Sequence, residues 1–105
     1  MNQKIAHVNL ESGSIRSERV SPELRRLFLG GRGINAFLLF QHTSRGMDPL
    51  AAEAPLIVGA GLLSGLPCPS ASRCSITAKS PETDLLADSN IGGFFAAELR
   101  KTGFD

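Results

Sequence analysis

Glycine and proline divide this sequence into short segments, and this division limits what the chain can fold into. The longest apolar stretch, from Ala54 to Leu63, is interrupted by Pro55, Gly59 and Gly61. A helix that spans a bilayer needs about 20 predominantly apolar residues, so this stretch is far too short and we expect no membrane span. The segments between the breaks favour short strands and short helices.

An alternating pattern predicts that the chain begins with a β-hairpin. Over residues 4–10 an apolar side chain occupies every second position, and we expect this face of the strand to be buried. The apolar members are Ala6, Val8 and Leu10, and the polar ones between them are His7 and Asn9. A turn that contains Gly13, which tolerates positive φ, then leads into a second strand over residues 15–20.

Capping signals and apolar spacing predict three short helices. Ser21 can cap the first helix, Pro22 suits its first position, and the glycine pair at residues 30–31 ends it. The second helix, over residues 33–42, is apolar nearly all round, so we expect it to be buried on most sides. The third helix begins at residue 92 or 93 and runs to residue 101.

Short apolar runs predict further strands between the helices. They are expected over residues 56–60, 73–79 and 85–88. The stretch from 61 to 72 is rich in glycine, proline and serine, and long loops inside compact domains often carry function. Residues 1–105 are therefore expected to form one α+β unit, with a mixed or antiparallel sheet and three short helices.

Charge and cysteine spacing exclude several classes of function. The formal net charge is +1, from 11 basic and 10 acidic residues, so no basic excess is available to bind nucleic acid. Cys68 and Cys74 are too far apart for the close pairs of zinc or iron–sulfur sites, and we expect two free, partly buried thiols. No nucleophile or phosphate-loop motif is present. The N-terminus lacks the apolar run of a signal peptide, which indicates a cytoplasmic protein.

Three polar motifs remain as candidates for binding chemistry, at residues 30–33 (GGRG), 70–73 (SASR) and 88–93 (DSNIGG). The first offers an anion backbone N–H groups and an arginine at a helix start. Arg73 could bind phosphate or a polar ring edge, and Asn90 has the donor and the acceptor that a heterocycle edge requires. Taken singly, each motif also has a plain structural explanation: glycines that turn the chain, a surface arginine and an asparagine helix cap.

Taken together and in order, these motifs resemble the N-terminal region of aldehyde ferredoxin oxidoreductases, a family of tungsten- or molybdenum-pterin enzymes. The resemblance covers essentially the whole chain and is strongest from Pro69 to Asp105. Its further motifs are Asn9-Leu10, Ser12-Gly13, Asp48-Pro49-Leu50, the run from Leu56 to Gly65, Lys79-Ser80-Pro81, Glu98-Leu99 and Gly103-Phe104-Asp105.

The resemblance implies a bis-pterin cofactor that carries tungsten or molybdenum. In this family an arginine and an Asn-X-Gly motif from the matching region contact the pterin, and by motif these are Arg73, Asn90 and Gly92. Arg73 would bond polar pterin or phosphate atoms, Asn90 the pterin edge, and Gly92 would present a backbone N–H. The resemblance also implies a 4Fe-4S cluster that passes electrons to ferredoxin. The cluster ligands and the catalytic acid/base residues would lie beyond this chain.

The resemblance further implies that residues 1–105 are a partial N-terminal domain, one half of a duplicated unit, and inactive alone. The complete enzyme would oxidise aldehydes, or related carbonyl or aromatic-acid substrates. The partner of this chain would be the remainder of the enzyme polypeptide, and we expect the isolated chain to self-associate through exposed strand edges and apolar surface. The alternative, favoured by the short chain, is a small non-enzymatic binding or assembly module that has kept the fold.

Overall fold

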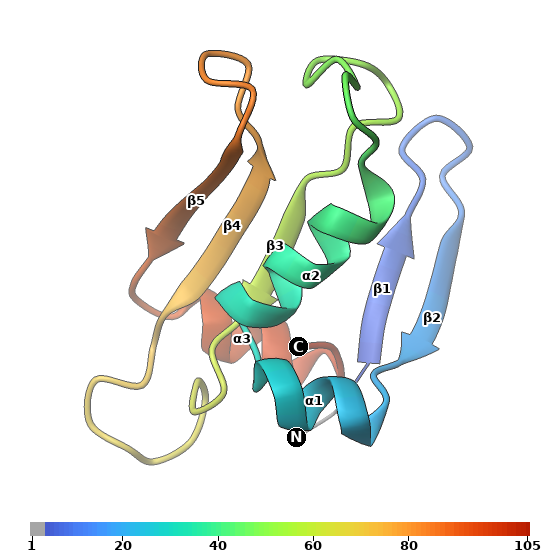
Figure 1. Ribbon diagram of the computed structural model, residues 1–105. Coiled ribbons are helices and arrows are strands. Elements are labelled where there is room, and N and C mark those ends of the chain that lie inside the picture. Colours follow the sequence, from blue (N-terminus) through green and yellow to red (C-terminus); the bar gives the residue numbers. More distant parts are fainter. Residues whose placement is uncertain (1–3) are drawn as a thin grey trace.

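The computed structural model describes residues 4–105, and within this range the expected α+β arrangement of short elements is confirmed (Figure 1). The strands are β1 (Lys4–Val8), β2 (Ile15–Arg19), β3 (Ile57–Ala60), β4 (Cys74–Lys79) and β5 (Leu86–Ile91). The helices are α1 (Pro22–Phe28), α2 (Arg32–His42) and α3 (Phe95–Lys101). The strands form two antiparallel sheets, in the orders β1–β2 and β3–β4–β5. No helix in the described range is long and apolar enough to cross a membrane.

The N-terminal hairpin is present, but of its predicted buried face only Ala6 is partly buried, and Leu10 is exposed. β1 and β2 pair from Lys4↔Arg19 to Val8↔Ile15. Val8 is exposed, whereas the side chain of His7 is partly buried. The reason lies outside the hairpin, because the ring of His7 packs edge-on against that of His42, with 5.9 Å between their centroids. The side of β1 that meets α2 is therefore the one predicted to face solvent.

The first helix begins where the sequence predicts. The Ser21 Oγ accepts a hydrogen bond from the backbone N–H of Leu24 at 3.1 Å, and Pro22 occupies the first helical position. Such a cap satisfies one of the N–H groups that a helix start leaves without a partner. The helix ends at Phe28, and its C-cap is Leu29, just before the glycine pair, with a positive φ of 60°. The glycines at 30–31 thus form the connection to α2 and do not cap α1.

Helix α2 covers one face of the β3–β4–β5 sheet, and α3 packs on the other face at one end (Figure 1). On the α2 side, the amide of Asn35 reaches the side chain of Thr77 in the middle of β4. On the α3 side, Ala96 forms a small apolar cluster with Ala60 and Cys74. Because successive residues of a strand point to opposite faces, these contacts assign every position of the sheet to one helix or the other.

The prediction that the second helix is buried on most sides does not hold for the described chain. Ile34, Asn35 and Leu39 are buried, but Phe40 is 82% exposed. Only the face toward the sheet is fully covered, because the hairpin and α1 shield α2 only in part. The fold class is nevertheless as predicted. That the chain is half of a duplicated domain stays a prediction, and residues 1–3, which entered the reading of the N-terminus, lie outside the described range.

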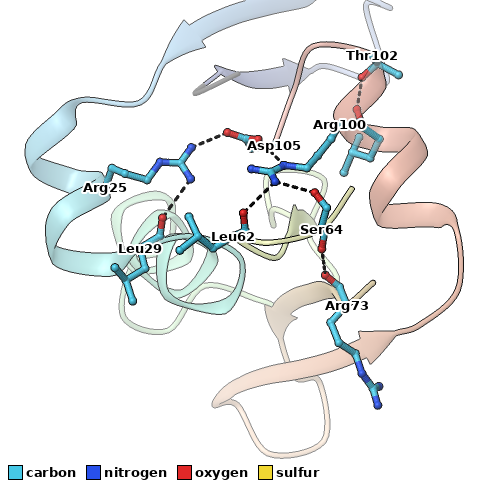
Figure 2. Close-up of polar contacts among 9 residues, drawn as sticks. Arg25, Leu29, Leu62, Ser64, Arg73, Arg100, Thr102 and Asp105 are labelled. Atoms are coloured by element: carbon cyan, nitrogen blue, oxygen red, sulfur yellow. Dashed lines mark hydrogen bonds and ion pairs between the residues drawn. The ribbon is translucent and has the colours of Figure 1, made fainter. Parts of the chain in front are cut away.

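A buried group of charges, the Asp105 cluster (Arg25, Arg100 and Asp105), joins α1 to α3 and to the last residue of the chain (Figure 2). The carboxylate of Asp105 accepts a hydrogen bond from Arg25 Nη2 at 2.5 Å and one from Arg100 Nε at 2.9 Å. Arg100 Nη1 also donates to the backbone carbonyls of Leu62 and Ser64, at 2.9 and 2.7 Å. The cluster therefore connects α1, α3 and the long loop, and it fixes the start of that loop.

Candidate functional site

All three polar motifs converge on one end of the β3–β4–β5 sheet. β4 runs antiparallel to both its neighbours, with Cys74 opposite Ala60 on one side and Ile91 on the other. The residue before β4, Arg73, therefore lies beside the residues that follow the neighbouring strands. Antiparallel pairing thus places the motifs at residues 70–73 and 88–93 next to each other, although no side-chain hydrogen bond or ion pair joins them.

The glycine motif before α2 packs against the same end of the sheet, backbone on backbone. A Cβ added to Gly31 would lie 3.4 Å from the Cα of Gly61, and Gly31 has a positive φ of 50°. A Cβ on Gly61 would come within 2.9 Å of the carbonyl oxygen of Arg73. Gly61 needs glycine because a side chain would clash with the Arg73 carbonyl, whereas Gly31 favours glycine because of its positive φ. The N-terminus of α2 is thereby brought to the start of β4.

The backbone of Arg73 is fixed while its side chain is exposed. Its carbonyl accepts hydrogen bonds from the N–H of Gly61 and from the Oγ of Ser64, both at 2.9 Å. Ser64 is in turn held through its own carbonyl by Arg100, so the Asp105 cluster supports this anchor (Figure 2). The guanidinium of Arg73 points away from that cluster and makes no hydrogen bond or ion pair within residues 4–105. The backbone of Arg73 is thus held in place, and its guanidinium has donors that are not used within residues 4–105.

The first and third polar motifs meet in the Asp88 network, which comprises Arg32, Thr77, Asp88 and Asn90. Arg32 Nε donates to Asp88 Oδ2 at 2.7 Å, and Thr77 Oγ1 donates to Asp88 Oδ1 at 2.9 Å. The Asn90 amide donates to Asp88 Oδ2 at 3.5 Å, which is the long end of hydrogen-bond distances. The network joins the GGRG motif to the DSNIGG motif. The sequence alone did not predict this contact, because the two motifs are far apart along the chain.

Asn35 is a buried member of the site that sequence reasoning missed. Its side chain is almost completely buried, and its Nδ2 donates to the Ser75 carbonyl at 3.1 Å and to Thr77 Oγ1 at 3.2 Å. A Cβ on Gly59 would lie 2.3 Å from Asn35 Oδ1, so this glycine makes room for the amide. The signal was available, because a single asparagine inside an otherwise apolar helix is a buried polar group in need of partners.

Gly92 differs from the other glycines of the site because nothing in the described chain explains it. A Cβ at this position would meet no atom within 4 Å, and its φ is not in the left-handed region. Gly93, by contrast, has a φ of 83°, which favours glycine for conformational reasons. A glycine without a steric or conformational requirement, exposed beside Arg73, fits a place where a ligand approaches the backbone closely.

The electrostatics of this end of the sheet favour an anionic or polar ligand. Arg32 and Arg73 are both exposed, and the carboxylate of Asp88, with a side chain 10% exposed, is already bonded on both oxygens. Burial raises the pKa of the Cys74 thiol, only partly opposed by a hydrogen bond from the Gly59 backbone, so Cys74 is neutral at neutral pH. Cys68 is exposed and Cys74 is buried, and neither belongs to a cluster of three or more metal-ligating side chains within residues 4–105.

Residues 5–105 match the family model described as aldehyde ferredoxin oxidoreductase, N-terminal domain. A tungsten-containing aldehyde ferredoxin oxidoreductase of Pyrococcus furiosus is 38% identical over 97% of this chain, and its counterpart in Thermococcus kodakarensis is 36% identical over the same share. The WOR-like subunit of an aliphatic sulfonate oxidoreductase from Pyrococcus furiosus is 28% identical over 99% of the chain. The chain spans 17% of the length of each of these relatives.

A solved structure has the same fold. It is the active site complex BamBC of benzoyl coenzyme A reductase in complex with 1,5-dienoyl-CoA, with a TM-score of 0.95 and 38% sequence identity. The similarity covers 99% of this chain and 16% of the matched chain. These comparisons agree with the motif-based resemblance over essentially the whole described range.

Proposed function

The chain belongs to the aldehyde ferredoxin oxidoreductase family as a match to its N-terminal domain, and we propose that it contributes part of the metallopterin-binding site of such an oxidoreductase. The relatives named above are much longer polypeptides, and the region that matches this chain is only a part of each. The residues at the end of the sheet would then form one side of the site. The remainder of the polypeptide would complete it, and these 105 residues would be inactive alone.

The residues at this end of the sheet fit a pterin with phosphate groups. Arg73 is an exposed guanidinium on a fixed backbone, and its planar set of donors suits phosphate or ring oxygens. Asn90 is exposed and held only by long contacts, so its amide can exchange these for the edge of a heterocycle. Gly92 leaves its backbone N–H open to close approach. We add Arg32, which Asp88 holds two residues before Asn90 on the same strand.

The proposed reaction is the oxidation of an aldehyde, or of a related carbonyl or aromatic-acid compound. Once bound, a tungsten or molybdenum pterin supplies the redox chemistry, and electrons would leave through a 4Fe-4S cluster, held elsewhere in the enzyme, to ferredoxin. The names of the tungsten-containing relatives favour tungsten. Identity does not select the substrate, because an aldehyde enzyme and a benzoyl coenzyme A reductase are each 38% identical to this chain. A cytoplasmic location stays a prediction.

The open space around Gly92 is the observation that carries the proposal. In Gly92→Ala the added methyl group meets no atom of the described chain, so the stability of the fold should change by less than about 0.5 kcal/mol. In the complete enzyme, however, the methyl group would stand where the pterin approaches. We therefore expect Gly92→Ala to lower the metallopterin content several-fold while the thermal unfolding of the protein stays the same.

Arg73→Ala and Asn90→Ala should lower metallopterin content in the same way, measured as bound metal and as released pterin per protein. Arg45→Ala is the matched control for Arg73→Ala, because Arg45 is also exposed and has no bonded side-chain partner within residues 4–105. Unchanged metallopterin content in Gly92→Ala, Arg73→Ala and Asn90→Ala would show that this end of the sheet does not bind the cofactor. The non-enzymatic module of the same fold would then be the better explanation.

A further inference from the structure

The two faces of the β3–β4–β5 sheet differ sharply in polarity. The face toward α2 carries Ser75, Thr77, Asp88 and Asn90, which the register of β4 and β5 places side by side. The opposite face is the aliphatic face, defined here by Val58, Ile76, Ala78, Ala87, Ser89 and Ile91. None of these six side chains is ionisable.

At Ser75 and Thr77 the polar face is covered by α2, although Asn90 stays exposed, and the aliphatic face is largely open, which is the reverse of the usual arrangement. An antiparallel sheet with one face in water normally packs its apolar side on the core and turns its polar side outward. Here α2 lies over the polar face, and of the three helices in the described range it is α3 that packs on the other side, at its Ala60 and Cys74 end. Val58 and Ile91 remain 37% and 39% exposed. Much of the aliphatic face is therefore exposed in the described chain.

The chemistry of the aliphatic face limits what can cover it. A face without charge offers nothing to the acidic or basic patches through which transient partners are steered, so an electron carrier or a nucleic acid does not fit it. A flat, neutral and aliphatic surface fits an apolar layer that stays in place permanently, as in the interior of a domain. The family relatives contain enough further polypeptide to form such a layer, because this chain corresponds to only 17% of their length.

We infer that the aliphatic face is an internal interface, covered in the complete enzyme by an apolar layer from the remainder of the same enzyme polypeptide. The inference rests on the part of the proposed function that makes this chain one piece of a longer enzyme. It does not depend on the pterin site, which lies at the end of the sheet and on its other face. The covering layer packs over Val58 and Ile76 and continues the cluster that α3 begins at Cys74.

Hydrogen–deuterium exchange of the complete enzyme tests the inference, with this chain and the remainder joined or expressed together. Val58→Lys would place a charge inside the interface, and we expect exchange over residues 57–60 and 74–79 to accelerate about tenfold or more. Ile76→Ala introduces no charge and should have a smaller effect of the same kind. Leu10→Lys is the matched control, because Leu10 is 92% exposed in the hairpin turn. Light scattering gives the mass of each variant.

Faster exchange in both interface variants, at unchanged mass and with Leu10→Lys like the parent, supports the inference. If Val58→Lys behaves like Leu10→Lys, the face is uncovered and the inference is wrong. If Val58→Lys lowers the mass, a second copy or another subunit covers the face, which also overturns it. Should Val58→Lys fail to fold, Ile76→Ala decides by the same criteria. Metallopterin content, measured in the parent enzyme, separates a failure of the pterin site from a failure of this interface.

Discussion

Two groups of arginine and aspartate in this small fold form the same kind of ion pair but differ in their exposure to solvent. In the Asp105 cluster the carboxylate and both guanidinium side chains are nearly buried, with 10%, 12% and 9% of their surfaces exposed. In the Asp88 network the carboxylate is equally buried, but its partner Arg32 is 65% exposed. The first group turns its donors inward onto backbone carbonyls. The second holds an arginine at the surface, where Asp88 is its only side-chain partner within residues 4–105.

The difference shows how to tell an arginine that holds a fold together from one that is available to a ligand. Arg100 donates to Asp105 and to two backbone carbonyls, so its bonding is committed to the chain. Arg32 donates to Asp88 through Nε only, and its terminal nitrogens make no hydrogen bond within residues 4–105. Exposure and bonding, and not the presence of an ion pair, separate the two roles. Substitutions in the two groups should therefore have very different effects on stability.

The largest effect is expected for Asp105→Ala. Removing this carboxylate takes away the charge to which both Arg25 and Arg100 are bonded, and breaking a buried pair in this way costs about 3–5 kcal/mol. The free energy of unfolding, measured in urea, should fall by that amount, or the protein should fail to fold. Glu98→Ala is the control, because its ion pair with Lys101 is exposed and should contribute about 1 kcal/mol or less. Equal losses in the two variants would contradict the structural role of the Asp105 cluster.

The next largest effect is expected for Asn35→Ala, which removes the buried amide beneath the Asp88 network. The Ser75 carbonyl and the Thr77 hydroxyl lose a donor in a region that water does not reach, at a cost of about 1–3 kcal/mol. Phe40→Ala, on the exposed side of the same helix, should cost far less despite its larger loss of side chain. Urea unfolding of the two variants compares them directly. A greater loss in Phe40→Ala would mean that α2 is covered on the side that the structure leaves open.

Local signals predicted much of the fold, because they depend on neighbours in sequence. Ser21 and Pro22 marked the start of α1, and the hairpin was found from its alternation. β5 was predicted too short, over 85–88 in place of Leu86–Ile91, because Asp88 and Asn90 are poor strand formers. Their strand conformation comes from pairing with β4 and from side-chain bonds to Thr77 and Ser75.

The candidate site was only partly predictable for a related reason. Motifs identified Arg73, Asn90 and Gly92, and the structure gathers them at one end of the sheet, while their role in cofactor binding stays a prediction. The contribution of Asn35 depends on Thr77, which is 42 positions away. The apolar periodicity of the helix predicts its buried face but not the partners of a single asparagine. Which face of the sheet α2 covers is likewise a tertiary fact. Alternation along β4 shows that two faces exist, but not that the polar one is covered.

The smallest loss of stability in this series is expected for Arg32→Ala. Its ion pair with Asp88 is formed by a guanidinium in contact with water, and such pairs contribute about 1 kcal/mol or less. The loss should shrink further in concentrated salt, because the Debye length falls to about 3 Å at 1 M. The cost of Asp105→Ala should persist there, because buried charges are screened much less. Urea unfolding of both variants at low and high sodium chloride therefore measures the contrast between the two groups.

The same Arg32→Ala variant should nevertheless affect the proposed function strongly. If Arg32 presents its terminal nitrogens to the phosphate of a pterin, the complete enzyme should lose metallopterin several-fold while its fold remains intact. Arg32→Lys keeps the charge but loses the planar fork, and it should restore stability more fully than cofactor content. A loss of stability in Arg32→Ala as large as that in Asp105→Ala would remove the distinction between the two groups. Arg32 would then be a structural residue, and the site would rest on Arg73, Asn90 and Gly92 alone.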